Sequence, residues 1–136
     1  MDAEALARRS LQADAVFCVA AGTVALVARK TAGKGLRLPV PVVVGAGGAS
    51  SLWGAGLFLA STQEDWRTPT AVVAGSNVVA ADGLALLALA RGRGAARTAT
   101  MLLAGTVGAF SLVQGYAWLQ GRSEPDEAPQ AAGAAS

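Results

Sequence analysis

Two long stretches of this chain contain no charged residue. One covers 24 residues from Leu38 to Ser61, and the other covers 22 residues from Thr98 to Leu119. A helix of about 20 apolar residues crosses the hydrocarbon core of a bilayer, which is roughly 30 Å thick. A water-soluble chain of 136 residues could not bury several such helices on every side. We therefore expect an integral membrane protein.

The hydrophobic residues, 53% of the chain, gather into four segments separated by short connections that contain Gly, Pro and charged residues. The expected spans are about 11–28, 38–61, 70–90 and 98–119. We predict an all-α fold in which residues 1–120 form a bundle of four transmembrane helices with short loops, the first loop being Arg29–Arg37. The polar residues 121–136 lack the apolar surface to fold alone, and we predict that they form a disordered C-terminal tail.

The first span could instead be the apolar core of a cleaved signal peptide, because Arg8 and Arg9 precede it. The acids Asp2, Glu4 and Asp14 do not fit that pattern, and three further spans follow. A retained first helix is therefore the favoured interpretation.

Lys and Arg in short loops indicate orientation, because cytoplasmic loops are enriched in them. Seven lie in the first and third connections and four on the opposite side. The count predicts that both termini lie outside the cell. The expected location is the cell membrane, which in a bacterium is the inner membrane. Three aromatic residues then fall on the outer side, as in an aromatic belt: Trp66, Tyr116 and Trp118.

The inventory of reactive side chains excludes several function classes. His is absent and Cys18 is the single cysteine, so there is no Cys/His set for zinc, haem or an iron–sulfur cluster, and no Cys–His nucleophile. We expect Cys18 to be a small buried residue, and we expect no catalytic residue, cofactor or metal site. The basic residues form no single patch, so nucleic-acid binding is not expected. The expected partners are the lipid bilayer and either a second copy of the chain or a larger membrane complex.

Polar side chains inside an apolar span are costly, about 2.5–3.5 kcal/mol for a charge near the bilayer centre, and usually face the bundle interior. At about 1.5 Å per residue, Asp14, Asn77 and Gln114 lie roughly 5, 10 and 8 Å from the outer ends of their spans. Small residues follow Asp14 and Asn77 at helical spacing, which indicates faces that pack against other helices. We predict that these three side chains form an intramembrane polar cluster.

Two interpretations of this cluster stay open. The amides could hold the helices together by hydrogen bonds worth about 0.6–2 kcal/mol, while Asp14 lies at the interface beside Arg8, Arg9 or the positive end of its helix. Alternatively, Asp14 could titrate in a binding or proton-handling site.

Asp82 is a second acidic candidate. It follows Asn77 by five residues, which rotates it by about 140° to another face of the helix. Facing lipid, it would have to be protonated, because burial raises the pKa of a carboxyl group. It could also face a second subunit or a basic residue from the first or third loop, or Asp82–Gly83 could mark a break in the helix. The sequence does not decide among these alternatives.

The second span contains a small residue every four positions, Gly47, Ser51 and Ala55. Small residues let membrane helices approach each other closely, so we expect close packing within the bundle or in a dimer.

Two resemblances follow from these residues. The layout Arg9, Leu11, Asp14, Ala15 at the first span, with an Asn in the third, resembles the uncharacterised small four-helix integral membrane proteins of bacteria over about Arg8–Arg122, which implies no activity. The size, the four helices and the acid in the first helix also resemble small multidrug resistance transporters. In that family a membrane-embedded Glu exchanges protons for a cationic drug across an antiparallel dimer, and the resemblance gives this role to Asp14.

The expected function is therefore structural or accessory, without catalysis. The alternative is a proton-coupled transporter or channel for a small molecule or cation that uses Asp14 as its titrating group.

Overall fold

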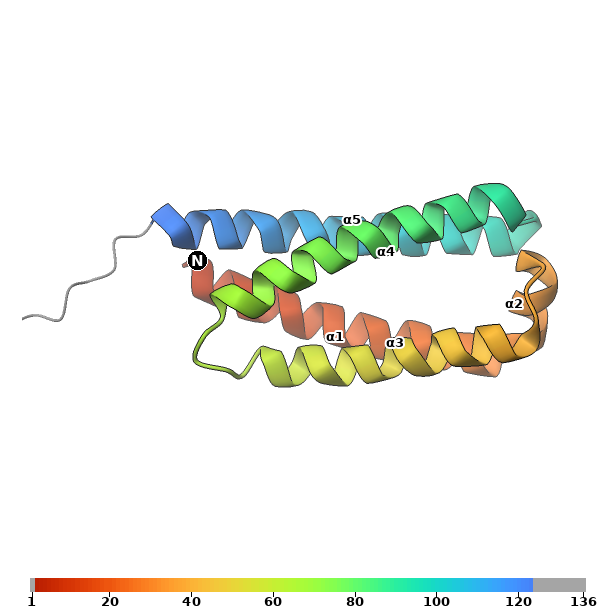
Figure 1. The fold of residues 1–136 in the computed structure, drawn as a ribbon, viewed down its shortest axis with the longest axis horizontal. Helices are drawn as coiled ribbons and strands as arrows, with labels where there is room; N and C mark the ends of the chain where they lie inside the picture. Colours follow the sequence, from red (N-terminus) through yellow and green to blue (C-terminus); the bar gives the residue numbers. More distant parts are fainter. Residues whose placement is uncertain (1, 124–136) are drawn as a thin grey trace, which may run out of the picture.

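The computed structural model describes residues 2–123, which form five α-helices and no strand (Figure 1). The helices are α1 (Ala3–Val27), α2 (Arg29–Leu36), α3 (Val40–Ala60), α4 (Arg67–Arg91) and α5 (Gly94–Ser123). All except α2 are long and apolar enough to cross a membrane. The predicted all-α bundle is confirmed, and the chain is a multi-pass membrane protein. Of the predicted tail, residues 124–136 lie outside the described residues.

Helix α2 corrects the prediction of a loop at Arg29–Arg37. Two glycines and several charges in this segment favour a turn, but α2 packs against α3 and α5 and only Ala28 separates it from α1. The Arg93 N–H donates to the Gly35 carbonyl at 3.1 Å, which ties α2 to the connection before α5. Tertiary contact therefore stabilises a helix that is too short to form alone.

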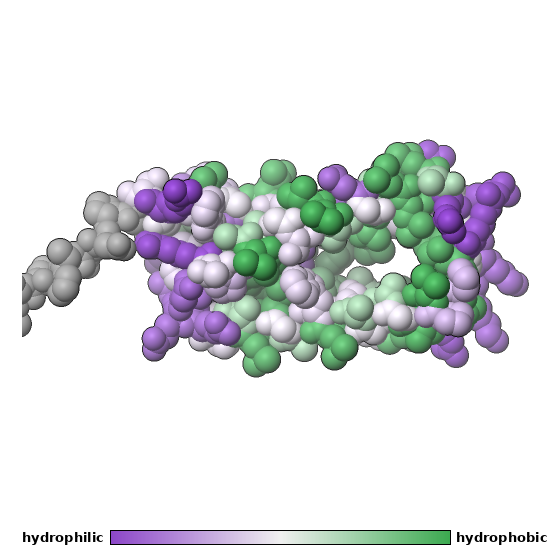
Figure 2. Space-filling model, viewed as in Figure 1, coloured by the Kyte–Doolittle hydropathy of each residue, from purple (hydrophilic) through white to green (hydrophobic). Residues whose placement is uncertain are grey.

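The four long helices form two antiparallel pairs, α1 with α3 and α4 with α5 (Figure 1). Helix α1 also packs against α5, whereas α3 and α4 have almost no contact. Figure 2 shows the surface hollowed between the two pairs toward the α2 end. The pairs are therefore joined mainly along α1 and α5, and this seam carries the candidate site.

Small residues bring α1 and α3 into backbone contact. A Cβ added at Gly54 would lie 2.7 Å from the Ala15 carbonyl oxygen, and one at Gly47 would lie 2.9 Å from the Gly22 carbonyl oxygen. The close packing that the small residues of this span predict thus occurs within the bundle. Gly45, Gly48 and Gly56 on the same helix have no such neighbour within 4 Å.

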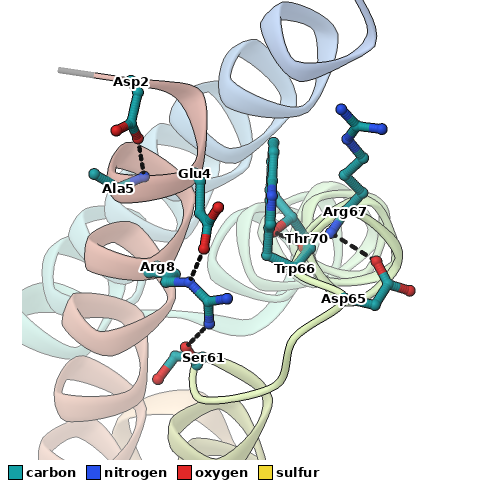
Figure 3. A network of polar contacts seen from close by, with 9 residues as sticks. All are labelled: Asp2, Glu4, Ala5, Arg8, Ser61, Asp65, Trp66, Arg67 and Thr70. Atoms are coloured by element: carbon teal, nitrogen blue, oxygen red, sulfur yellow. Dashed lines mark hydrogen bonds and ion pairs between the residues drawn. The ribbon is translucent and has the colours of Figure 1, made fainter. Parts of the chain in front are cut away.

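The end of the bundle that holds the N-terminus is closed by polar and aromatic contacts (Figure 3). The Arg8 guanidinium donates to Glu4 at 2.8 Å and to the Ser61 carbonyl at 2.7 Å, which links α1 to the end of α3. Trp66 is buried among Ala3, Ala7 and Ala117, so its ring packs within the bundle. A Trp at the turn into α4 fills the space that these alanines leave.

Helix α4 begins at a capping carboxylate. Asp65 accepts hydrogen bonds from the backbone N–H groups of Arg67 at 3.0 Å and Thr68 at 3.2 Å. The Thr68 hydroxyl and these N–H groups hold the pKa of the Asp65 carboxyl below its usual value, because they favour its charged form. This carboxylate thus satisfies two backbone N–H groups of the first turn of α4, the helix that also carries Asn77.

Candidate functional site

Asp14, Asn77 and Gln114 meet inside the bundle, from α1, α4 and α5 respectively. One oxygen of Asp14, Oδ2, accepts a hydrogen bond from Asn77 Nδ2 at 2.7 Å and another from Gln114 Nε2 at 3.0 Å. Asn77 Nδ2 also donates to Gln114 Oε1 at 3.1 Å, which closes a triangle. We call these three residues the polar cluster; its hydrogen bonds directly link the two helix pairs.

The other carboxylate oxygen faces the adjacent turn of α1. Cys18 Sγ donates to Asp14 Oδ1 at 3.5 Å, and the Cys18 carbonyl accepts from Ser50 of α3 at 2.9 Å. The cysteine is buried, as the sequence predicts for a small residue, but it also contacts the carboxylate. Its position one turn after Asp14 was the only sequence signal for this contact.

The polar cluster is enclosed by protein. Asp14 and Gln114 are 0% exposed and Asn77 is 4% exposed. Leu11, Ala15 and Val73 pack around them as part of one apolar core. No buried side-chain nitrogen or oxygen in the described part of the chain lacks a hydrogen-bond partner. Both oxygens of Asp14 and both polar atoms of the Gln114 amide thus have partners within the chain.

Arg8 does not pair with Asp14, because Glu4 and the Ser61 carbonyl already hold its guanidinium. The Asp14 side chain instead accepts hydrogen bonds from the neutral amides of Asn77 and Gln114. Hydrogen bonds to a charged group contribute more than those between neutral groups, about 1.5–3 kcal/mol each.

Asp82 does not join the polar cluster. Helix α4 continues through Asp82 and Gly83, so a helix break is excluded. The Asp82 side chain is exposed, and within residues 2–123 it has no ion pair or hydrogen bond, so a basic partner from the first or third connection is excluded there. Its neighbours on that surface are exposed apolar side chains: Val78, Val79, Leu86 and Leu89. The carboxyl group faces lipid or another protein.

Two concave regions of the surface, of about 650 Å³ and 640 Å³, lie away from the cluster. One is an apolar groove between α1 and α3, lined by residues such as Val19 and Phe58. The other lies at the junction of α2 and α3 and contains Lys30, Lys34 and Arg37. None of the three cluster residues lines either region.

No known relative assigns a role to these sites. Neither a protein family, nor a curated protein, nor a solved structure matches the chain. Among the described residues there is also no group of three His, Cys, Asp or Glu side chains that could hold a metal ion. The function has to be argued from the polar cluster and from Asp82.

Proposed function

We propose that the protein is a structural or accessory membrane protein without catalytic activity, which assembles with another membrane protein or with a second copy. The observation that carries this proposal is the enclosure of Asp14. A site for a transported ligand has to open to one side of the membrane. Here the carboxylate is fully buried and its oxygens already have three donors. This arrangement supports a cross-link between helix pairs.

Asp82 supports the assembly part of the proposal. A carboxyl group among lipid-facing Val and Leu side chains raises the cost of membrane insertion, and such residues usually contact a polar partner. A neighbouring helix that presents a Lys, an Arg or an amide would remove that cost. We further place the protein in a bacterial inner membrane with both termini outside, because the seven basic residues of the first and third connections exceed the four on the other side.

A proton-coupled transporter remains the second candidate, and one feature favours it. The surface is hollowed between the two helix pairs toward the α2 end (Figure 2), and the polar cluster joins the same two pairs. A separation of the pairs could then connect Asp14 with this hollow.

Proton release separates the two candidates. Purified protein in weakly buffered detergent is mixed with tetraphenylphosphonium and a panel of smaller organic cations, and the pH is followed with a dye. We expect no release from folded wild type or from Asp14→Asn. Release from wild type that disappears in Asp14→Asn would make Asp14 a coupling group and overturn the proposal.

Asp82 gives a second prediction. For the isolated protein, Asp82→Leu is expected to raise the free energy of unfolding in mixed micelles by about 1 kcal/mol, because an unpaired carboxyl group leaves the lipid-facing surface. Ser76→Leu is the matched control, since Ser76 is partly exposed on the same helix and its hydroxyl already donates to the Val72 carbonyl at 2.9 Å. A loss of stability in Asp82→Leu would mean that Asp82 stabilises the lone chain, contrary to the proposal.

A further inference from the structure

The end of the bundle formed by α2 is strongly cationic. Seven Lys and Arg residues lie in α2, in the connections that follow α2 and α4, and at the adjoining ends of α4 and α5: Arg29, Lys30, Lys34, Arg37, Arg91, Arg93 and Arg97. The acids among residues 2–123 lie elsewhere, four at the opposite end and two within the spans. The hydrophilic residues at the right of Figure 2 mark this end. Its positive charge therefore has no internal counterpart.

Three of these cations share one concave site at the junction of α2 and α3. Lys30, Lys34 and Arg37 line a hollow of about 640 Å³. Lys30 and Lys34 are four residues apart and so lie on one face of α2. Within residues 2–123 none of the three makes an ion pair or a side-chain hydrogen bond. In contrast, Arg29 at the start of the same helix donates to the Leu26 carbonyl at 2.9 Å.

Arg37, one of the three cations, has a left-handed backbone conformation that is unfavourable for a residue with a Cβ. Arg37 has φ 53°, the one positive φ of a non-glycine residue among residues 2–123. A residue in this conformation ends α2, with the Leu38 N–H donating to the Gly33 carbonyl at 2.9 Å. Glycine normally takes this position because a Cβ is unfavourable there. An arginine in its place indicates that the guanidinium has a use.

The remaining wall of the site is apolar and belongs to the start of a membrane span. Leu38, Pro39 and Val40 line it, and α3 enters the apolar region from there. The site thus combines cations with an apolar wall at the start of a helix that is long and apolar enough to cross a membrane. A free phosphate would use only the cations, whereas a phospholipid would use both parts.

We propose that Lys30, Lys34 and Arg37 bind the headgroup phosphate of an anionic phospholipid, whose acyl chain lies against Leu38 and Val40. Three unpaired cations favour a lipid with net negative charge over a zwitterionic one. This inference needs only the membrane location and does not depend on the accessory or transport role.

The test is native mass spectrometry of the full chain in detergent, titrated with phosphatidylglycerol or phosphatidylcholine. The test variant is Lys30→Gln/Lys34→Gln/Arg37→Gln. The matched control, Arg91→Gln/Arg93→Gln/Arg97→Gln, removes the same charge from the same end but outside the hollow. We expect the test variant to lose at least tenfold in apparent affinity for phosphatidylglycerol and the control to lose less than threefold.

Several outcomes would overturn the proposal. Equal losses in both variants would mean a diffuse attraction to the positive end, and equal binding of phosphatidylcholine would remove the preference for negative charge. Displacement of the lipid by millimolar inorganic phosphate would assign the cations to a free anion. Arg37→Gly removes the guanidinium, and its backbone can keep the positive φ without strain because glycine has no Cβ. We expect this variant to lose lipid affinity while retaining its thermal stability. Unchanged lipid affinity in Arg37→Gly would show that the Arg37 guanidinium does not bind the lipid, contrary to the proposal.

Discussion

Replacing Asn77 by leucine is expected to lower the free energy of unfolding by about 2–3 kcal/mol. Asn77 Nδ2 supplies the shortest hydrogen bond to Asp14, 2.7 Å, and the 3.1 Å bond to Gln114 Oε1. The substitution leaves a buried carboxylate with one amide donor fewer and removes the donor to a buried amide oxygen. Hydrogen bonds to charged groups contribute about 1.5–3 kcal/mol, and an unsatisfied buried group adds a desolvation penalty. Reversible unfolding in mixed micelles measures the loss.

The control for this prediction removes the whole polar cluster. In Asp14→Leu/Asn77→Leu/Gln114→Leu only the Cys18 thiol, a weak donor, loses its hydrogen-bond partner. Replacing a complete set of buried polar groups by apolar residues is often close to neutral. We therefore expect the triple variant to be more stable than Asn77→Leu alone. If the triple variant instead loses as much free energy of unfolding as three large single effects added together, the cluster stabilises the bundle by more than the pairing of its own polar groups. A loss below about 0.5 kcal/mol in Asn77→Leu would show that Asp14 does not depend on this donor.

The sequence predicts well that Asp14, Asn77 and Gln114 lie at similar heights along their helices. A rise of about 1.5 Å per residue converts positions in three spans into depths, and polar residues at one depth on inward faces have few other partners. The structure places Asp14, Asn77 and Gln114 within hydrogen-bond distance, with no other side chain as a partner except Cys18. Which atom donates to which oxygen depends on rotamers and helix rotation, which the sequence pattern does not contain.

Helix α2 and Trp66 show where sequence patterns fail. The composition of Arg29–Leu36 favours a turn, and only contact with α3 and α5 makes a helix of it. Trp66 looks interfacial from its place at the end of a span, yet it is 8% exposed because three alanines and Gly121 leave room for its ring. Both outcomes depend on residues far apart in the chain. A local pattern carries no information about them.

The second large effect is expected at Gly54, one of the positions where α1 and α3 are in backbone contact. A Cβ at this position would lie 2.7 Å from the Ala15 carbonyl oxygen and 3.1 Å from the Val19 backbone nitrogen. These are backbone atoms, so no side chain can rotate away and the two helices have to separate. We expect Gly54→Val to lower the free energy of unfolding by about 3 kcal/mol, at the upper end of the usual cost of overpacking. Gly54→Ala should cost about 1–2 kcal/mol, since its single methyl group forces a smaller separation.

Gly56 is the control position, because a substitution there measures the general preference of helices for alanine over glycine without the contact made at Gly54. It lies on the same helix, two residues later, and a Cβ there would have no heavy atom within 4 Å. Gly56→Ala should therefore be neutral or stabilising by up to about 1 kcal/mol, because alanine loses less backbone entropy in a helix. Opposite signs for the same change at Gly54 and Gly56 would establish that α3 packs on α1 through the face that contains Gly54. Similar effects at both positions would show that the Gly54 face of α3 does not pack against the backbone of α1.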